Sequence, residues 1–142
     1  MRIGTWNLAG WWSADHLALL QAQVCDVWLL TEVPADASIP GLKGHRTKQE
    51  MTPGKAWAGI FAGMEFLPQP DPHPASAMVL VEDFRVMSSV LPWRGCGPSW
   101  EGATLEEKMR GALSSLRVFI DEGLSGRVTG IKHWRPVTTS AH

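Results

Sequence analysis

Two stretches, RIGTWNL at positions 2–8 and CDVWLLTEV at positions 25–33, decide the expected fold of this chain. The first predicts a strand, because its side chains alternate between two faces and Trp6 and Leu8 share one of them. The second is nearly unbroken apolar sequence, which is typical of a strand buried on both faces. Ser13 is a suitable N-cap for a helix between them. This strand–helix–strand order predicts a layered α/β sandwich, that is, an α+β arrangement of mixed sheets with flanking helices.

The rest of the sequence predicts further short elements. They are a helix over 14–23, a loop over 34–53 with one short strand near 45–48, a strand over 56–62, a proline-rich turn region over 68–74, a hairpin of strands 75–81 and 84–90, and a helix from Thr104 to about Glu122. The last helix opens with Thr104-Leu105-Glu106-Glu107, a capping box in which Glu107 reaches back to Thr104.

Composition narrows the class of protein. The chain has 142 residues and a formal net charge of -1, so no basic excess points to nucleic acid. A bound metal ion would supply local positive charge, so a nucleic-acid substrate stays open. Cys25 and Cys96 lie far apart and fit reduced thiols better than an implied disulfide. The sequence offers no signal peptide and no membrane span, and we expect a cytoplasmic protein.

Tryptophan is unusually abundant, with eight residues beside no tyrosine. Some of these side chains could stack on a ligand, which would suit a non-catalytic, Trp-rich binding module for carbohydrate or a protein partner. The other interpretation is packing in the core and at sheet edges.

Two polar residues stand where the apolar strands end. Asn7 closes the first strand, and Glu32 follows the second. If these strands are neighbours, both side chains emerge at the same edge of the sheet. A carboxylate and an amide oxygen there suit Mg²⁺ or Mn²⁺, which can polarise a phosphoryl oxygen. Taken alone, the pattern also fits a solvated Glu and an Asn that caps a turn.

The two motifs together resemble the endonuclease/exonuclease/phosphatase family of metal-dependent phosphohydrolases. The Trp6-Asn7 pair is similar to the Trp-Asn or Tyr-Asn pair of that family's opening strand. The stretch from Asp26 to Val33 is similar to its second signature, with Thr31 where Gln is common. The resemblance implies that Glu32 is a metal ligand and that Asn7 orients Glu32 and the metal site. It also implies Mg²⁺ or Mn²⁺ as cofactor and a phosphoester substrate, either nucleic acid or a small phosphoester.

The resemblance covers residues 1–123, the amino-terminal half of such a domain. The family's catalytic His is replaced by Leu91-Pro92-Trp93 here, and its Asp-x-Asn and terminal Asp-His motifs are absent from this sequence. We therefore expect a truncated and inactive form of the hydrolase. Half a sandwich would leave a sheet edge open, which predicts marginal stability or self-association through that edge.

The tail, residues 124–142, stands where the Asp-x-Asn motif belongs. A shifted reading of codons permitted for RVTGIKHW, residues 127–134, encodes Gly-Asp-Trp-Asn-Gln-Ala-Leu-Ala. The sequence thus suggests that the tail is an out-of-frame, disordered translation of the missing motif, with chance as the other explanation.

Overall fold

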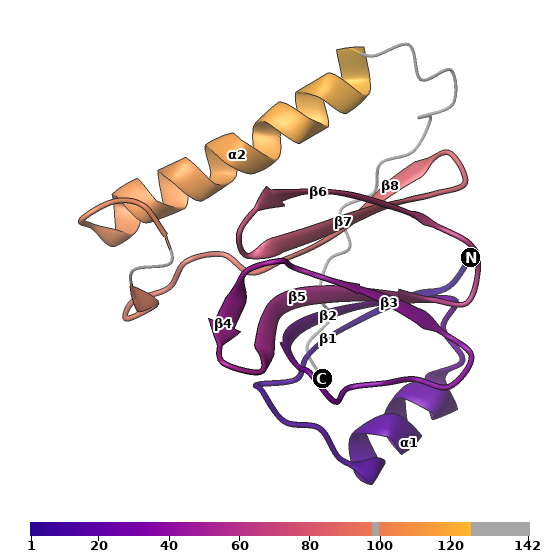
Figure 1. The fold of residues 1–142 in the computed structure, drawn as a ribbon. Coiled ribbons are helices and arrows are strands. Elements are labelled where there is room, and N and C mark those ends of the chain that lie inside the picture. The colour runs from indigo at the N-terminus through magenta and orange to yellow at the C-terminus, as the bar shows by residue number, and fades with distance from the viewer. Residues whose placement is uncertain (98–99, 126–142) are drawn as a thin grey trace.

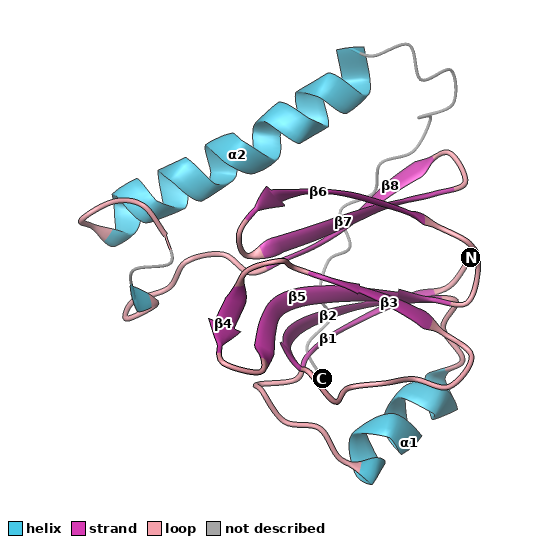
Figure 2. Cartoon of the chain, viewed as in Figure 1, coloured by secondary structure: helices cyan, strands magenta, loops and turns pink. Residues whose placement is uncertain are grey.

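The computed structural model describes residues 1–97 and 100–125. Its elements are β1 (Ile3–Asn7), α1 (Ala14–Gln23), β2 (Val27–Pro34), β3 (Lys43–Arg46), β4 (Glu50–Thr52), β5 (Lys55–Ala62), β6 (Leu67–His73), β7 (Ser76–Val81), β8 (Phe84–Ser89) and α2 (Leu105–Ser125). The predicted mixture of helices and strands is confirmed (Figure 2). The segment suggested as out of frame, residues 127–134, lies outside the described residues.

The elements stack in layers (Figure 1). The helix α1 lies below the sheet that contains β1 and β2, here called sheet A; the sheet of β6, β7 and β8, called sheet B, lies above sheet A; and α2 lies above sheet B. Sheet A has the strand order β1-β2-β5-β3, with β4 also paired to β5. Only β1 and β2 run parallel, so sheet A is mixed. Sheet B has the antiparallel order β6-β7-β8. This is the layered arrangement of mixed sheets and flanking helices that the pattern predicts.

Each pair of adjoining layers encloses its own apolar cluster. Leu20 of α1 packs with Trp28 and Leu30 on one face of sheet A. Residues of β2 and β5 meet residues of β7 and β8 between the sheets, with Val79 completely buried. A third cluster around Trp100 contains Ala112 of α2. The strand β2 is buried on both faces because it contributes to two of these clusters, as its unbroken apolar sequence indicates.

The helix α1 begins where its cap predicts. Ser13 has extended backbone, and its side chain accepts a hydrogen bond from the backbone N–H of His16. The helix ends at Val24, whose left-handed backbone donates its N–H to the carbonyl of Gln21. These local bonds place β2 back alongside β1, with Asn7 opposite Thr31.

The proline-rich stretch was predicted as a turn, and that prediction was wrong. It forms β6, which pairs with β7 at the edge of sheet B. Pro68, Pro70 and Pro72 have no N–H groups to donate, and the register of β6 with β7 shifts between Gln69 and His73, the stretch that holds Pro70 and Pro72. An edge strand tolerates these prolines, because only its other side must supply a ladder of hydrogen bonds.

The region 34–53 holds more structure than its predicted single strand. Two strands form, β3 and β4, and both pair with β5. Thr47 between them is buried and accepts hydrogen bonds from the N–H groups of Trp57 and Ala58. This polar side chain therefore completes the pairing where the strand register breaks.

Two further expectations concern bonding and membrane insertion. Cys25 and Cys96 are both free thiols, as expected. Within residues 1–97 and 100–125, no helix combines the length and the apolar character needed to cross a bilayer.

Candidate functional site

The structure brings Asn7 and Glu32 together. The two strands that carry them are parallel neighbours, with Asn7 in register with Thr31. The amide Nδ2 of Asn7 donates to Oε1 of Glu32 over 3.2 Å. The expected meeting of these side chains at one edge of sheet A is therefore confirmed, while their chemical roles stay predictions.

A backbone hydrogen bond sets the orientation of the Asn7 amide. The N–H of Ala9 donates to Oδ1 of Asn7 over 2.8 Å. An N–H group requires an oxygen acceptor, so the amide nitrogen must face Glu32. Asn7 thus orients the carboxylate through a donated hydrogen bond, and the second lone pair of Oδ1 is what remains for a cation.

The backbone of Glu32 is unusual. Its φ is 53°, in the left-handed region that non-glycine residues seldom adopt. In the pairing with β5, Thr31 matches Ala58 and Val33 matches Ala56 in the same register, and Glu32 between them is left without a partner. Such a conformation costs on the order of 1–3 kcal/mol and is concentrated at functional sites. The left-handed backbone therefore falls on the residue that carries the candidate metal-binding carboxylate.

The Glu32 carboxylate retains one unbonded oxygen. Within the described part of the chain, Oε1 receives the Asn7 amide and Oε2 has no hydrogen-bond donor. Glu32 is half-buried, so the free oxygen remains reachable from solvent. An oriented carboxylate with one unbonded oxygen suits a hard cation.

The donor set fits Mg²⁺ or Mn²⁺ better than zinc. In residues 1–97 and 100–125, His, Cys, Asp and Glu side chains form no group of three suited to a metal. Structural and catalytic zinc sites need three or four such ligands. Mg²⁺ commonly uses one or two carboxylates and completes its shell with water and substrate phosphate. A site built on Glu32 is compatible with that mode of binding.

Lys55 and Trp11 stand beside the pair, although the sequence analysis assigned them no role. The N–H of Gly10 donates to the carbonyl of Glu32 over 3.0 Å, which holds the loop after β1 against β2. Gly10 has φ +74°, and a side chain there would meet the Lys55 chain at 3.0 to 3.3 Å. The Lys55 ammonium lies 5.9 Å from the ring centroid of Trp11. The sequence held one signal for this role: Lys55 is a charged residue at the start of β5, the strand next to β2.

His73 ends β6 of sheet B, at the same end of the sandwich. The Ser88 hydroxyl donates to the carbonyl of Leu30 over 2.8 Å, which joins β8 to β2 just before Glu32. His73 stacks on Trp100, and its Nδ1 accepts the N–H of Ala75 over 3.1 Å. Burial lowers the pKa of His73 below its ordinary value of 6.5, against the opposing effect of the Glu101 carboxylate. His73 is therefore neutral at pH 7 and carries its proton on Nε2.

Most tryptophans belong to the packed interior. Trp28, Trp57 and Trp100 are buried, and only Trp11 and Trp93 among the described indoles are more than a third exposed. Trp93 lies edge-on to Trp57 and Trp100, with centroids 6.0 and 5.6 Å away. The packing interpretation therefore accounts for most of the tryptophan content, and it leaves Trp11 as the most exposed ring.

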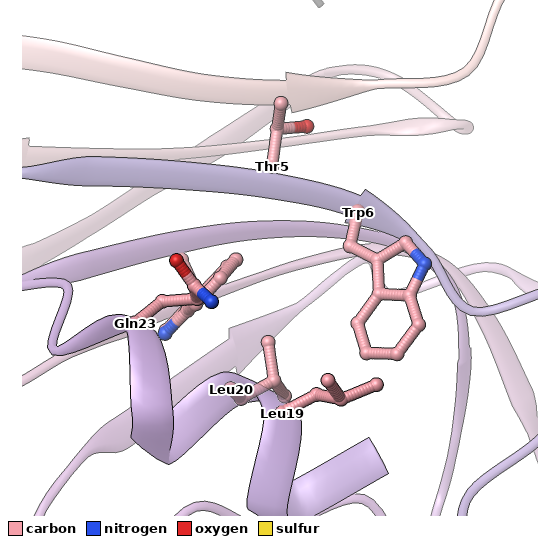
Figure 3. Close-up of a pocket in the computed structure, with 6 residues that line it drawn as sticks. Thr5, Trp6, Leu19, Leu20 and Gln23 are labelled. Atoms are coloured by element: carbon pink, nitrogen blue, oxygen red, sulfur yellow. The ribbon is translucent and has the colours of Figure 1, made fainter. Parts of the chain in front are cut away.

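Two hollows lie away from the Asn7–Glu32 pair. One, of about 450 Å³, is lined by Lys48, Gln49, Asp71 and Pro74. The other, of about 230 Å³, lies between α1 and sheet A, where Trp6 reaches down toward Leu19 and Leu20 while Thr5 points the opposite way (Figure 3). Neither hollow includes Asn7 or Glu32 in its lining.

Comparisons with known proteins provide no relative from which the roles of these residues could be transferred. No family model, no curated protein and no solved structure matches the chain. The assignment of the site therefore depends on its own geometry and on the motifs quoted above.

Proposed function

We propose that this chain contributes the first half of the active site of a Mg²⁺- or Mn²⁺-dependent phosphoester hydrolase. Glu32 would ligate the metal, and Asn7 would hold the carboxylate in place. The observation that carries the proposal is the 3.2 Å hydrogen bond between them at the ends of two parallel strands. Carboxylates oriented by a fixed donor bind cations better than free ones, because less order must be imposed on binding.

The residues present would position rather than transform the substrate. Oε2 of Glu32 would be the oxygen available to the cation, while the Asn7 amide holds Oε1 and the Ala9 N–H holds Asn7. When bound, the metal ion supplies Lewis-acid polarisation of a phosphoryl oxygen. The Lys55 ammonium adds positive charge beside the position of the phosphoester. These groups bind and orient; a general base and the Asp-x-Asn groups would come from sequence this chain does not contain.

Metal binding by Glu32 gives the direct test. We expect Glu32→Gln to abolish saturable Mn²⁺ binding, measured by electron paramagnetic resonance of free Mn²⁺. Asn7→Ala should weaken binding by roughly 10- to 100-fold, as loss of an orienting neighbour does. Glu82→Gln is the matched control, because Glu82 is an exposed carboxylate in the β7–β8 turn. Equal Mn²⁺ binding by the wild type and Glu32→Gln would refute the proposal.

The same variants address activity. We expect the chain to turn over phosphodiesters with Mn²⁺ no faster than its Glu32→Ala variant, because the catalytic groups beyond residue 123 are missing from its sequence. Turnover by the wild type that disappears in Glu32→Ala would overturn the assignment as an inactive form while supporting the metal site itself.

A further inference from the structure

We propose that Trp11 and Lys55 form a platform that selects a nucleotide-type phosphoester, with the indole stacking on the base and the ammonium facing the phosphate. The inference rests on the proposed function, since it places that platform beside the Glu32 metal site. It goes further by choosing phosphoesters with an aromatic ring over phosphosugars and simple phosphomonoesters.

Backbone hydrogen bonds fix the position of Trp11. The Gly10 N–H bonds the carbonyl of Glu32 itself, and the Trp11 N–H bonds the carbonyl of Leu8, each over 3.0 Å. The loop therefore leaves β1 at Asn7 and is tied to Glu32 immediately before the indole. A phosphoester held at Glu32 would therefore lie close to Trp11, because the residue before Trp11 is hydrogen-bonded to Glu32.

The Trp11 ring is open to solvent, whereas Trp28, Trp57 and Trp100 are buried. Its side chain is 72% exposed, the highest value among the described tryptophans. An exposed large aromatic ring on an ordered loop gains little for stability, because it removes little apolar surface from water. It is well suited to stacking on a base, which every nucleobase allows through its π-face.

Lys55 has its aliphatic stem fixed and its charge unpaired. The stem packs against Gly10, where no side chain could fit without contact at 3.0 to 3.3 Å. Within the described residues, its ammonium makes no ion pair, and it lies 5.9 Å from the centroid of the Trp11 ring. A lysine ammonium is a strong point charge for phosphate. Its contact with the ring also holds the indole and the charge at a fixed spacing.

The combination separates substrate classes. A simple phosphate monoester would use only the metal and Lys55, whereas a nucleotide would also stack on Trp11. Base stacking on an aromatic side chain contributes roughly a tenfold or greater gain in affinity. The platform therefore predicts a preference for nucleotides that depends on the ring and is the same for all bases.

Isothermal titration of the full chain in Mg²⁺ tests this, with adenosine 5′-monophosphate and ribose 5-phosphate as probes. We expect the nucleotide to bind at least about tenfold more tightly. Trp11→Ala should remove that difference, and Trp11→Phe should restore most of it. Lys55→Met should weaken both probes alike. Trp93→Ala, which removes the other exposed indole, should leave the preference intact.

The outcomes separate this inference from the proposed function. Equal affinity for both probes, or a preference that survives Trp11→Ala, overturns the platform even if Glu32→Gln abolishes Mn²⁺ binding. A preference that depends on Trp11 while Glu32→Gln leaves Mn²⁺ binding unchanged supports the platform and overturns the metal site. Loss of the preference in Trp93→Ala but not in Trp11→Ala would place the stacking ring in the loop after β8 and also refute the platform.

Discussion

Gly4 is a position where the absence of one side-chain atom, the Cβ, allows β1 and β2 to pack together. It pairs with Trp28 across the two strands. A Cβ at Gly4 would lie 2.4 Å from the Trp28 ring, closer than any tolerated contact. The bare backbone at Gly4 therefore lets the indole lie flat over β1 and fill the layer that faces α1.

Replacing Gly4 with Ala should lower the free energy of unfolding by about 1–3 kcal/mol, because the Trp28 ring must leave its position to admit the methyl group. Urea denaturation followed by circular dichroism measures the change. Gly111→Ala is the control: Gly111 lies within α2 and has open space around it, so the added methyl should stabilise the helix by roughly 0.5–1 kcal/mol. Equal effects from the two substitutions would contradict this account of Gly4.

At the scale of elements, α2 is held at its start by the predicted capping box. The N–H of Glu107 donates to Oγ1 of Thr104 over 3.1 Å, and Oε2 of Glu107 accepts the N–H groups of Thr104 and Ala103. These backbone hydrogen bonds lower the pKa of Glu107 below its ordinary value of 4.5. The helix packs through Ala112 and Leu116, while Leu113 on its other side is exposed.

Thr104→Ala should destabilise the protein by about 0.5–2 kcal/mol, since it leaves the Glu107 N–H without its side-chain acceptor. Glu106→Ala is the comparison, because its exposed ion pair with Arg110 should contribute only about 0.3–0.5 kcal/mol. Chemical denaturation at pH 7 compares them. The lowered pKa of Glu107 means that its contribution is present above pH 4.5 and is lost as the pH falls through the lowered pKa. A pH-independent effect of Glu107→Gln between pH 7 and pH 3 would argue against that linkage.

At the scale of the whole molecule, two sheet edges lie on the same side of the sandwich. β8 packs over β2 and β7 over β5, so the outer edge of β1 lies near that of β8, and both edges are free of partners among residues 1–97 and 100–125. The β6 edge on the other side is protected by its alternate prolines, a common defence against edge pairing. The strands β1 and β8 contain no proline. Self-association through an open edge, which the sequence predicts, is therefore best placed at β1 and β8.

We expect concentration-dependent dimerisation in sedimentation equilibrium, reduced by Thr5→Pro. The N–H of Leu8 points to β2, so by alternation the N–H of Thr5 points to the free edge, and its removal costs no bond within sheet A. Leu113→Lys tests the competing route through the exposed face of α2. Dimerisation lost in Leu113→Lys and kept in Thr5→Pro would assign the contact to α2 instead.

The sequence by itself determined the features that depend on neighbouring residues. The cap at Ser13, the hairpin of β7 and β8, and the box at Thr104 all appear as predicted, because each is made by side chains within a few positions of one another. Asn7 and Glu32 were found in the same way, as polar residues where apolar strands end. Their meeting followed from the prediction that the two strands are neighbours.

Only the tertiary structure decided what depends on contacts between distant segments. The proline-rich β6 becomes a strand because β7 lies beside it, and Lys55 reaches Trp11 because β5 lies beside β2. The Ala9 N–H determines which end of the Asn7 amide faces Glu32, and Glu32 takes its left-handed backbone at the one position of β2 that has no partner in β5, between Thr31 and Val33. Local patterns hold no information on these pairings, because strand neighbours are chosen by burial across the whole sandwich.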